Sequence, residues 1–372
     1  MNIPDSDTPD TPRYSIIIPE ETRARAADYL DALRCGANQP GARLHNRLQA
    51  ADLHVFGAED LLAALLDTKQ PRIFAEMAVV GNGSDWNLTE LGLLGDISVA
   101  VPVTIFDDGN HRNPAPHDPP FPGTLVFTPG ALLRNGLSHT PADWHEVTMP
   151  DGQFSEEGYF GLHQRRLLPV FRYINERAGT PRSAFITVPG LGCGQFAGPF
   201  QGQLGRKLQS VLERLLTKYG NSFPNIRAVY FDPYDECANV RTETHGISFM
   251  VRPLRIAGNR TKSQLCRPVY YAERIDDFTR CALFSIVAWD HVSWPGNDFF
   301  GGIRATDDGV KAAATNSMSV LTRIEGHYEA ASGRYQPPSP YATWGELVED
   351  ETRKPAIRLW RHHAVWRPDN AA

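Results

Sequence analysis

The sequence predicts an α/β sandwich built around a mixed β-sheet. From residue 183 onward, short apolar runs rich in β-branched residues alternate with longer segments whose apolar residues recur at helical spacing. Such alternation places helices on the faces of a largely parallel sheet. The chain has 372 residues, of which 41% are hydrophobic and 22% charged, and this fits a globular protein with one large core or two modest ones.

The first half of the chain predicts helices followed by strands. Residues 1–13 contain three prolines and almost no apolar side chains, so we expect a disordered tail. Residues 19–35 open with acidic residues, as the helix dipole favours, and residues 57–69 carry leucines at helical spacing, so both segments predict helices. Strands are predicted where β-branched residues follow, over 72–80, 96–106 and 123–130. The proline-dense segment 111–122 predicts a loop.

The second half predicts a regular succession of elements. Ser155 is expected to cap a long helix that kinks near Pro169 and turns Arg165 and Arg166 to solvent. The predicted strands that follow are 183–189, 225–232, 245–256 and 281–290, and the predicted helices are 199–220 and 309–333. In sheets of this kind, ligands bind beyond the carboxyl ends of the strands.

Composition argues against several classes of protein. No apolar run reaches the roughly 18 residues of a membrane span, and the N-terminus lacks the basic and apolar regions of a signal peptide. The five cysteines form no C-x-x-C pair, which disfavours a disulfide framework or a thiolate zinc site. The net charge of −6 disfavours a nucleic-acid partner. We therefore expect a cytoplasmic protein that binds neither membrane nor nucleic acid.

A glycine-rich loop, VPGLGCGQFAGPF (188–200), lies between a predicted strand and a predicted helix. Glycines let the backbone approach a ligand closely, and a helix N-terminus offers free N–H groups, a combination suited to a pyrophosphate. The candidate ligand-binding residues of this loop are Gly192, Gly194, Gln195 and Phe196. The spacing is neither a complete Rossmann fingerprint nor a P-loop, so a tight turn without a ligand stays open as the alternative.

A second loop, WDHVSWPGNDFFGGIRATDDG (289–309), places four aspartates around a glycine pair. Carboxylates repel phosphate, so these side chains must face ribose hydroxyls, a guanidinium or ammonium cation, or a divalent metal. Thr306 or Asp307 is placed to cap the helix that follows. The aspartates that remain for chemistry are Asp290, Asp298 and Asp308. Together the two loops offer an amide cradle beside carboxylates, which suits the parts of ADP-ribose.

These segments resemble a known family. The loop 188–200 resembles the second phosphate-binding loop of macrodomains, which are ADP-ribose-binding α/β/α modules. Residues 288–318 resemble the signature of the MavL-type bacterial effector macrodomains, which resemble enzymes that remove ADP-ribose from arginine of ubiquitin. The resemblance implies a three-layer α/β/α sandwich with a mixed sheet, a permuted loop order and an N-terminal helical extension. It implies that Asp290, Asp298 and Asp308 contact ADP-ribose and the modified arginine; further ligand contacts are expected at Gly301, Gly302 and Asp307.

The leading functional hypothesis is hydrolysis of the bond between ADP-ribose and a protein arginine, with Asp298 and Asp308 in the chemistry and Asp290 fixing the ribose or the guanidinium. The resemblance implies ADP-ribosylated ubiquitin or another ADP-ribosylated protein as partner, no metal or other cofactor, and action in the cell's own cytoplasm or in a host cytosol after translocation. Residues 14–150 are expected to pack on or complete the core, and residues 151–366 to form the catalytic core. A non-catalytic ADP-ribose reader and a metal-dependent hydrolase of an ADP-ribose derivative remain as alternatives.

Overall fold

The computed structural model describes residues 14–49, 51–71, 73, 85–136, 139–179, 181–274, 276–352 and 364–366. The tail expected over 1–13 and, apart from Ile73, the strand expected over 72–80 lie outside the described residues. No helix in the described ranges has both the length and the apolar character that a membrane span requires.

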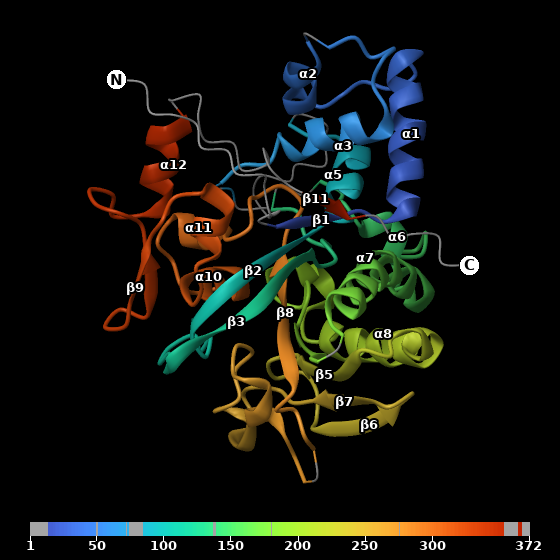
Figure 1. The fold of residues 1–372 in the computed structure, drawn as a ribbon. Coiled ribbons are helices and arrows are strands. Elements are labelled where there is room, and N and C mark those ends of the chain that lie inside the picture. The colour runs from blue at the N-terminus through green and yellow to red at the C-terminus, as the bar shows by residue number, and fades with distance from the viewer. Residues whose placement is uncertain are drawn as a thin grey trace.

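A nine-stranded mixed sheet in the order β11-β1-β2-β3-β8-β4-β5-β7-β6 forms the centre of the molecule (Figure 1). Its strands are β1 (Ser15–Ile17), β2 (Ser98–Asp107), β3 (Pro116–Pro129), β4 (Ser183–Pro189), β5 (Ile226–Asp232), β6 (Val240–Thr244), β7 (Ile247–Val251), β8 (Cys281–Trp289) and β11 (Ala364–Trp366). The neighbours β3, β8, β4, β5 and β7 run parallel, so their carboxyl ends meet at one edge of the sheet.

Helices cover both faces of this sheet, which makes the fold a three-layer α/β/α sandwich with a mixed sheet, as predicted. The helices are α1 (Glu20–Arg34), α2 (Ala42–Leu48), α3 (Ala58–Leu66), α5 (Leu88–Gly95), α6 (Trp144–Val147), α7 (Glu156–Arg177), α8 (Leu204–Tyr219), α9 (Asn297–Phe300), α10 (Asp307–Ala313), α11 (Ser317–Thr322) and α12 (Trp344–Thr352). The long helices α7 and α8 pack on one face, and the N-terminal helices with α10 and α11 pack on the other (Figure 1). Alternate strand residues divide between the two cores: Leu125 and Phe127 join one and Val126 the other.

Strand β3 is longer than predicted. Its first residues belong to the proline-dense segment that was expected to be a loop. Residues 116–122 pair with β2 through contacts such as Phe121 with Ile105, whereas pairing with β8 begins only at Gly123. Among the described residues, no strand pairs with the other side of residues 116–122. Proline, which lacks the N–H of a sheet ladder, is tolerated at such an edge.

The helix predicted over 309–333 is broken into α10 and α11, and a short hairpin of β9 (His327–Glu329) and β10 (Arg334–Gln336) follows. Asn316 interrupts the helix because it pairs with β2: its N–H donates to the carbonyl oxygen of Thr104 (3.3 Å), and its Oδ1 accepts from the N–H of Thr104 (2.7 Å). Strand β6 was also not predicted; it lies at the sheet edge and carries mostly exposed or half-buried side chains.

Candidate active site

The two predicted loops lie at the same edge of the sheet, after the neighbouring strands β4 and β8. Pairing between these strands ends at Thr187 and Ser285, whereas β8 continues to pair with β3 as far as Pro129 and Trp289. The sheet therefore opens between β4 and β8 just before the two loops begin. Openings at the carboxyl ends of parallel strands are the usual ligand sites of α/β folds.

Gly130, which follows β3, brings the two loops together. Its N–H donates to the carbonyl oxygen of Trp289 at the end of β8 (3.4 Å). A Cβ atom at Gly130 would lie 2.3 Å from the main-chain nitrogen of Gly192, so the glycine loop packs backbone to backbone against this residue. Gly192 itself has a φ of +70°, which favours glycine. The bond from the N–H of Leu133 to the carbonyl oxygen of Phe196 (2.8 Å) fixes the far side of the loop.

The prediction that a helix begins directly after the glycine loop is wrong. The loop continues into a 3₁₀ turn, Gln195–Phe200, and α8 begins only at Leu204. The N–H of Gly205, in the first turn of α8, donates to the Glu236 carboxylate (2.6 Å), so an internal side chain already takes a free donor of this helix. Gly194 and Gln195 are exposed and Phe196 is half-buried. Among the described residues, none accepts a hydrogen bond from the N–H of Gly194.

Asp290 directly follows β8, and its buried carboxylate closes a local turn. Its Oδ1 accepts from the N–H groups of Val292 (2.7 Å) and Ser293 (2.7 Å), and its Oδ2 accepts from the Ser293 hydroxyl (2.5 Å). Asp290 therefore fixes the start of the acidic loop, and its negative charge acts on the groups around it.

Asp308 lies in the first turn of α10, where Thr306 serves as the N-cap by accepting from the N–H of Gly309 (3.3 Å). The Oδ2 atom of Asp308 accepts from the N–H groups of Gly296 and Asn297, both at 3.1 Å. Its Oδ1 atom is buried and has no hydrogen-bond partner among the described residues. Burial raises the pKa of Asp308 well above its usual range, and the charges of Asp290 and Asp298 raise it further. Asp308 is a buried carboxylic acid with one oxygen free.

Asp298 lies at the start of α9, where its side chain is half-buried. It packs against α10, because a Cβ atom at Gly309 would lie 3.0 Å from the Cβ of Asp298. Within the described part of the chain, its carboxylate has no hydrogen-bond or ion-pair partner. Gly301 and Gly302 then turn the chain toward α10, and Gly302 adopts a φ of +75°.

Asp307 is held by two internal contacts at the opening between β4 and β8. Its Oδ2 accepts from the N–H of Ala288 (2.8 Å) and from the ammonium of Lys311 (3.0 Å), which also donates to the carbonyl oxygen of Ile286 (2.6 Å). Asp307 and Lys311 thus form hydrogen bonds with main-chain groups of β8 that lie beyond the last residue of β8 paired with β4. The structure brings Asp290 and Asp298 close enough to Asp308 for their charges to act on it, and it anchors Asp307 to the sheet.

Lys69, a buried residue beyond α3, is an unpredicted component of this site. Its ammonium lies 4.0 Å from the centre of the Trp289 ring and donates to the carbonyl oxygen of His291 (2.8 Å) and, less closely, to that of Asp290 (3.4 Å). Burial lowers the pKa of Lys69 to about 7, although the Asp290 carboxylate partly opposes this. The sequence around Lys69 gives no sign of burial, because its partners are main-chain groups far along the chain.

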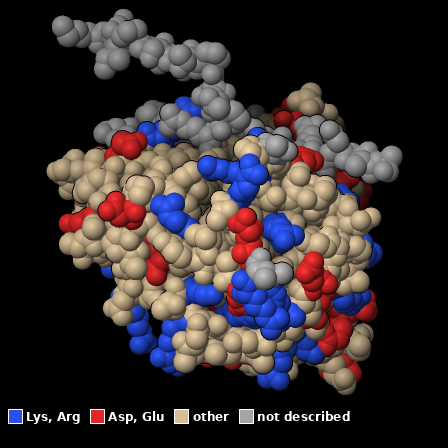
Figure 2. All heavy atoms as spheres, turned by 60° about the horizontal axis from the view of Figure 1, so that its bottom comes forward, with Lys and Arg blue, Asp and Glu red and all other residues tan. Residues whose placement is uncertain are grey.

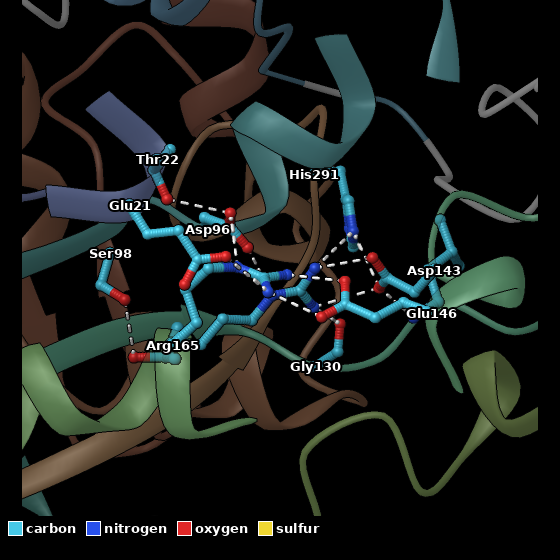
Figure 3. A network of polar contacts seen from close by, with 12 residues as sticks. Glu21, Thr22, Asp96, Ser98, Gly130, Asp143, Glu146, Arg165 and His291 are labelled. Carbon is cyan, nitrogen blue, oxygen red and sulfur yellow. Dashed lines mark hydrogen bonds and ion pairs between the residues drawn. The ribbon is translucent and has the colours of Figure 1, made fainter. Parts of the chain in front are cut away.

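A buried network of charged side chains holds the main chain at Gly130 (Figure 3). Arg166 donates to the carbonyl oxygen of Gly130 (2.8 Å), to both carboxylate oxygens of Asp143 (2.7 and 3.1 Å) and to Asp96 (3.3 Å). His291 contacts Asp143 through its Nε2 (3.2 Å). Burial alone would raise the pKa of Asp143, but Arg166, with a smaller contribution from His291, holds it well below its usual range.

The network also reaches the N-terminal helices. Asp96 accepts from Thr22 (2.9 Å) and Arg25 (2.7 Å) of α1 and from Arg165 of α7 (2.9 Å) (Figure 3). The prediction that Arg165 and Arg166 face solvent is wrong, because their side chains are only 8% and 0% exposed. Two adjacent arginines are tolerated there because the buried acids neutralise them.

Two observations bear on nucleophilic and metal chemistry. Cys193, in the glycine loop, is buried, and burial raises the pKa of its thiol well above the usual value, as expected of an inert cysteine. In the described ranges, no three His, Cys, Asp or Glu side chains are grouped so as to hold a metal ion.

Comparison with known proteins identifies the family. The sequence matches the family described as "Macrodomain effector MavL" over residues 14–341, which is most of the chain and includes both loops and every strand of the large sheet except β11. A comparison with curated proteins gives no match. The chain therefore belongs to the MavL family of macrodomain effectors, and this membership supports a function related to ADP-ribose.

Proposed function

We propose that the protein is an ADP-ribosyl hydrolase that cleaves the N-glycosidic bond between ADP-ribose and an arginine side chain of a protein, with ubiquitin as the expected substrate protein. One observation carries this proposal: Asp308 is a buried carboxylic acid with a free oxygen, beside Asp290 and Asp298 and at the edge that also bears the glycine loop. A protein that only bound a diphosphate would gain little from three carboxyl groups nearby, because negative charges repel.

The glycine loop is proposed to hold the nucleotide part of the substrate. Gly192, Gly194, Gln195 and Phe196 would lie along the diphosphate and its adjoining ribose, with the exposed N–H of Gly194 as a donor. Arg134, which is exposed, donates to Oε1 of Gln195 (2.7 Å) and adds a positive charge at the rim of this loop. A positive charge at this rim favours binding of a diphosphate. The acidic loop, whose carboxylates repel phosphate, would bind a different part of the substrate.

The acidic loop is proposed to carry the chemistry. Breaking the bond between the anomeric carbon and the guanidinium nitrogen develops positive charge on the ribose, which the carboxylate cluster stabilises. Asp298, whose carboxylate has no partner among the described residues, takes a proton from the attacking water as the water oxygen bonds to the anomeric carbon. The electron pair of the broken bond leaves with the guanidine nitrogen, and protonated Asp308 donates its proton to that leaving group. Asp290 shapes the loop, and its charge adds to the effect of burial, which is the main reason that Asp308 stays protonated.

The test compares turnover with binding. ADP-ribosyl-arginine ubiquitin is incubated with the wild type, Asp298→Ala, Asp308→Asn and a control, Asp28→Asn, which removes an exposed carboxylate from α1. Turnover is expected to fall by roughly 10²–10⁴-fold in the two loop variants and to stay unchanged in the control. Unchanged turnover in both loop variants would remove the mechanism.

Calorimetry with free ADP-ribose separates the alternatives. A wild type that binds ADP-ribose but releases none from the modified protein, with loop variants altered only in affinity, would be a reader. Loss of turnover in EDTA, restored by Mg²⁺ or Ca²⁺, would point instead to a metal-dependent hydrolase. The hydrolase proposal requires turnover that EDTA leaves intact and that the loop substitutions abolish.

A further inference from the structure

A cavity of about 320 Å³ lies at the amino-terminal ends of the central strands, away from the candidate active site. Phe121, Phe278 and Leu283 form its apolar wall, and Arg182 and Arg267 line it with charge. Because the nine-residue β8 runs from this end of the sheet to the acidic loop, the cavity lies roughly 25–30 Å from Asp290. A ligand there would leave the ADP-ribose edge of the sheet free.

Positive charge surrounds this cavity. Arg182, Arg227 and Arg280 are exposed, and within the described ranges none of them forms an ion pair. Arg280 directly precedes Cys281, which lines the cavity, and the charges of Arg227 and of the exposed Asp277 both act on that cysteine. Figure 2, which brings this end of the sheet forward, shows lysine and arginine side chains gathered near its centre, with acidic side chains among them. The basic character is local, because the chain as a whole has a net charge of −6.

Apolar side chains accompany the arginines. Val269, which lines the cavity, and the next residue along the chain, Tyr270, are 43% and 58% exposed. The guanidinium of Arg267 lies 4.5 Å from the centre of the Phe121 ring and donates to the carbonyl oxygen of Pro119, so the lining is held in place before any ligand binds. Exposed aromatic and aliphatic groups beside a pocket, rimmed by charge, are typical of protein-binding surfaces.

We propose that this cavity and its arginine rim are a docking site for an acidic segment of a partner protein. One aromatic side chain of the segment fills the apolar cavity, and carboxylates on either side of it pair with Arg182, Arg280 and their neighbours. The cavity is small for a cofactor but suits one anchoring side chain. A peptide is favoured over a nucleic acid because an extended phosphate backbone would run from the local basic rim onto a negatively charged protein.

The experiment measures the fluorescence anisotropy of a labelled heptapeptide, EEEWEEE, with the full-length protein. The variants are the double substitution Arg182→Glu with Arg280→Glu and a control, Arg172→Glu, which reverses an exposed charge on α7. The double variant is expected to weaken binding by at least about tenfold, and the control to leave it unchanged. The peptide EEEAEEE is expected to bind at least about tenfold more weakly than the tryptophan peptide.

Each other outcome rejects the proposal. Equal weakening in the double variant and the control would mean a diffuse charge effect, and equal binding of the two peptides would mean that the cavity holds no anchor. A labelled oligothymidylate that binds more tightly and depends on the same arginines would identify a nucleic-acid site. Absence of binding at millimolar peptide would also overturn the proposal. Hydrolysis of the modified ubiquitin, measured in parallel, reports separately on the proposed enzymatic function.

Discussion

Arg166 donates a 2.8 Å hydrogen bond to the carbonyl oxygen of Gly130, and this contact joins the buried charge network to the strand end that both loops touch. The guanidinium lies among Asp96, Asp143 and a main-chain oxygen, and the side chain is fully buried. A planar, permanently charged group with several donors suits such a position better than a lysine would.

The substitution Arg166→Met is expected to lower the free energy of unfolding by about 3–5 kcal/mol, because it leaves the buried Asp143 without its main cation. Urea denaturation measures this. Arg166→Lys should recover only part of the loss, since an ammonium cannot reproduce the paired contacts to Asp143. Arg172→Met, an exposed change on the same helix, is the matched control. A loss below about 1 kcal/mol for Arg166→Met would contradict the importance of the network.

Gly130→Ala is expected to disturb both loops, because the added Cβ would lie 2.3 Å from the main-chain nitrogen of Gly192. We expect a loss of about 1–3 kcal/mol in stability and a weaker affinity for ADP-ribose, measured by thermal denaturation and calorimetry. Gly161→Ala, where a Cβ meets nothing within 4 Å, is the control and should stabilise α7 by up to about 1 kcal/mol. Normal ADP-ribose affinity in Gly130→Ala would separate this residue from the binding site.

Lys69 should make stability rise with pH. Its pKa is about 7 in the folded protein and near the ordinary lysine value of 10.5 in the unfolded chain, so between these values the unfolded state binds more protons. The wild type should therefore gain up to about 1.4 kcal/mol of unfolding free energy per pH unit, relative to Lys69→Met, from pH 7 toward pH 10. Denaturation at pH 7, 8 and 9 tests this difference. A difference that stays flat would show that Lys69 is not a buried, titrating ammonium.

Asp308 should make the stability of the protein fall as the pH rises, which is the opposite of the effect of Lys69. Its pKa is raised in the folded protein, so its contribution to stability is complete below its unfolded value and is lost as pH rises toward its folded value. Asp308→Asn keeps an acceptor for the N–H groups of Gly296 and Asn297 and removes the proton that titrates. The variant should therefore gain stability relative to the wild type as the pH rises above the ordinary range of a carboxyl group, while hydrolysis is lost. Equal pH dependence of the two proteins would show that Asp308 ionises normally.

The sequence predicted the layered fold and most of the strands because their apolar runs are long and end at polar or glycine-rich loops. Where predictions failed, contacts between distant residues decided the local structure. Asn316 stops a helix because it pairs with Thr104, and prolines enter β3 because no described strand pairs with one side of residues 116–122. Neither partner can be read from the local sequence.

The sequence also indicated the acidic loop, whose aspartates the structure brings together. It could not show how differently they are held: Asp290 closes a turn, Asp307 is bound by Lys311, and Asp308 keeps one oxygen free. Lys69 and Arg166 were missed because a buried cation is recognised only by the distant oxygens around it. The roles proposed for the site residues, and the division into parts at residues 14–150 and 151–366, stay predictions.

The ion pair of Asp307 and Lys311 has a consequence for how such a sheet can be built. These two side chains lie one helical turn apart on α10, and together they serve an N–H and a carbonyl oxygen of β8 that a neighbouring strand would otherwise meet. A strand can thus diverge from its neighbour without leaving main-chain groups unpaired, and the opening between β4 and β8 is a fixed part of the fold. Any redesign that changes the width of this opening must change both side chains together, because the buried Lys311 or the half-buried Asp307 alone would be a charge without its counterpart.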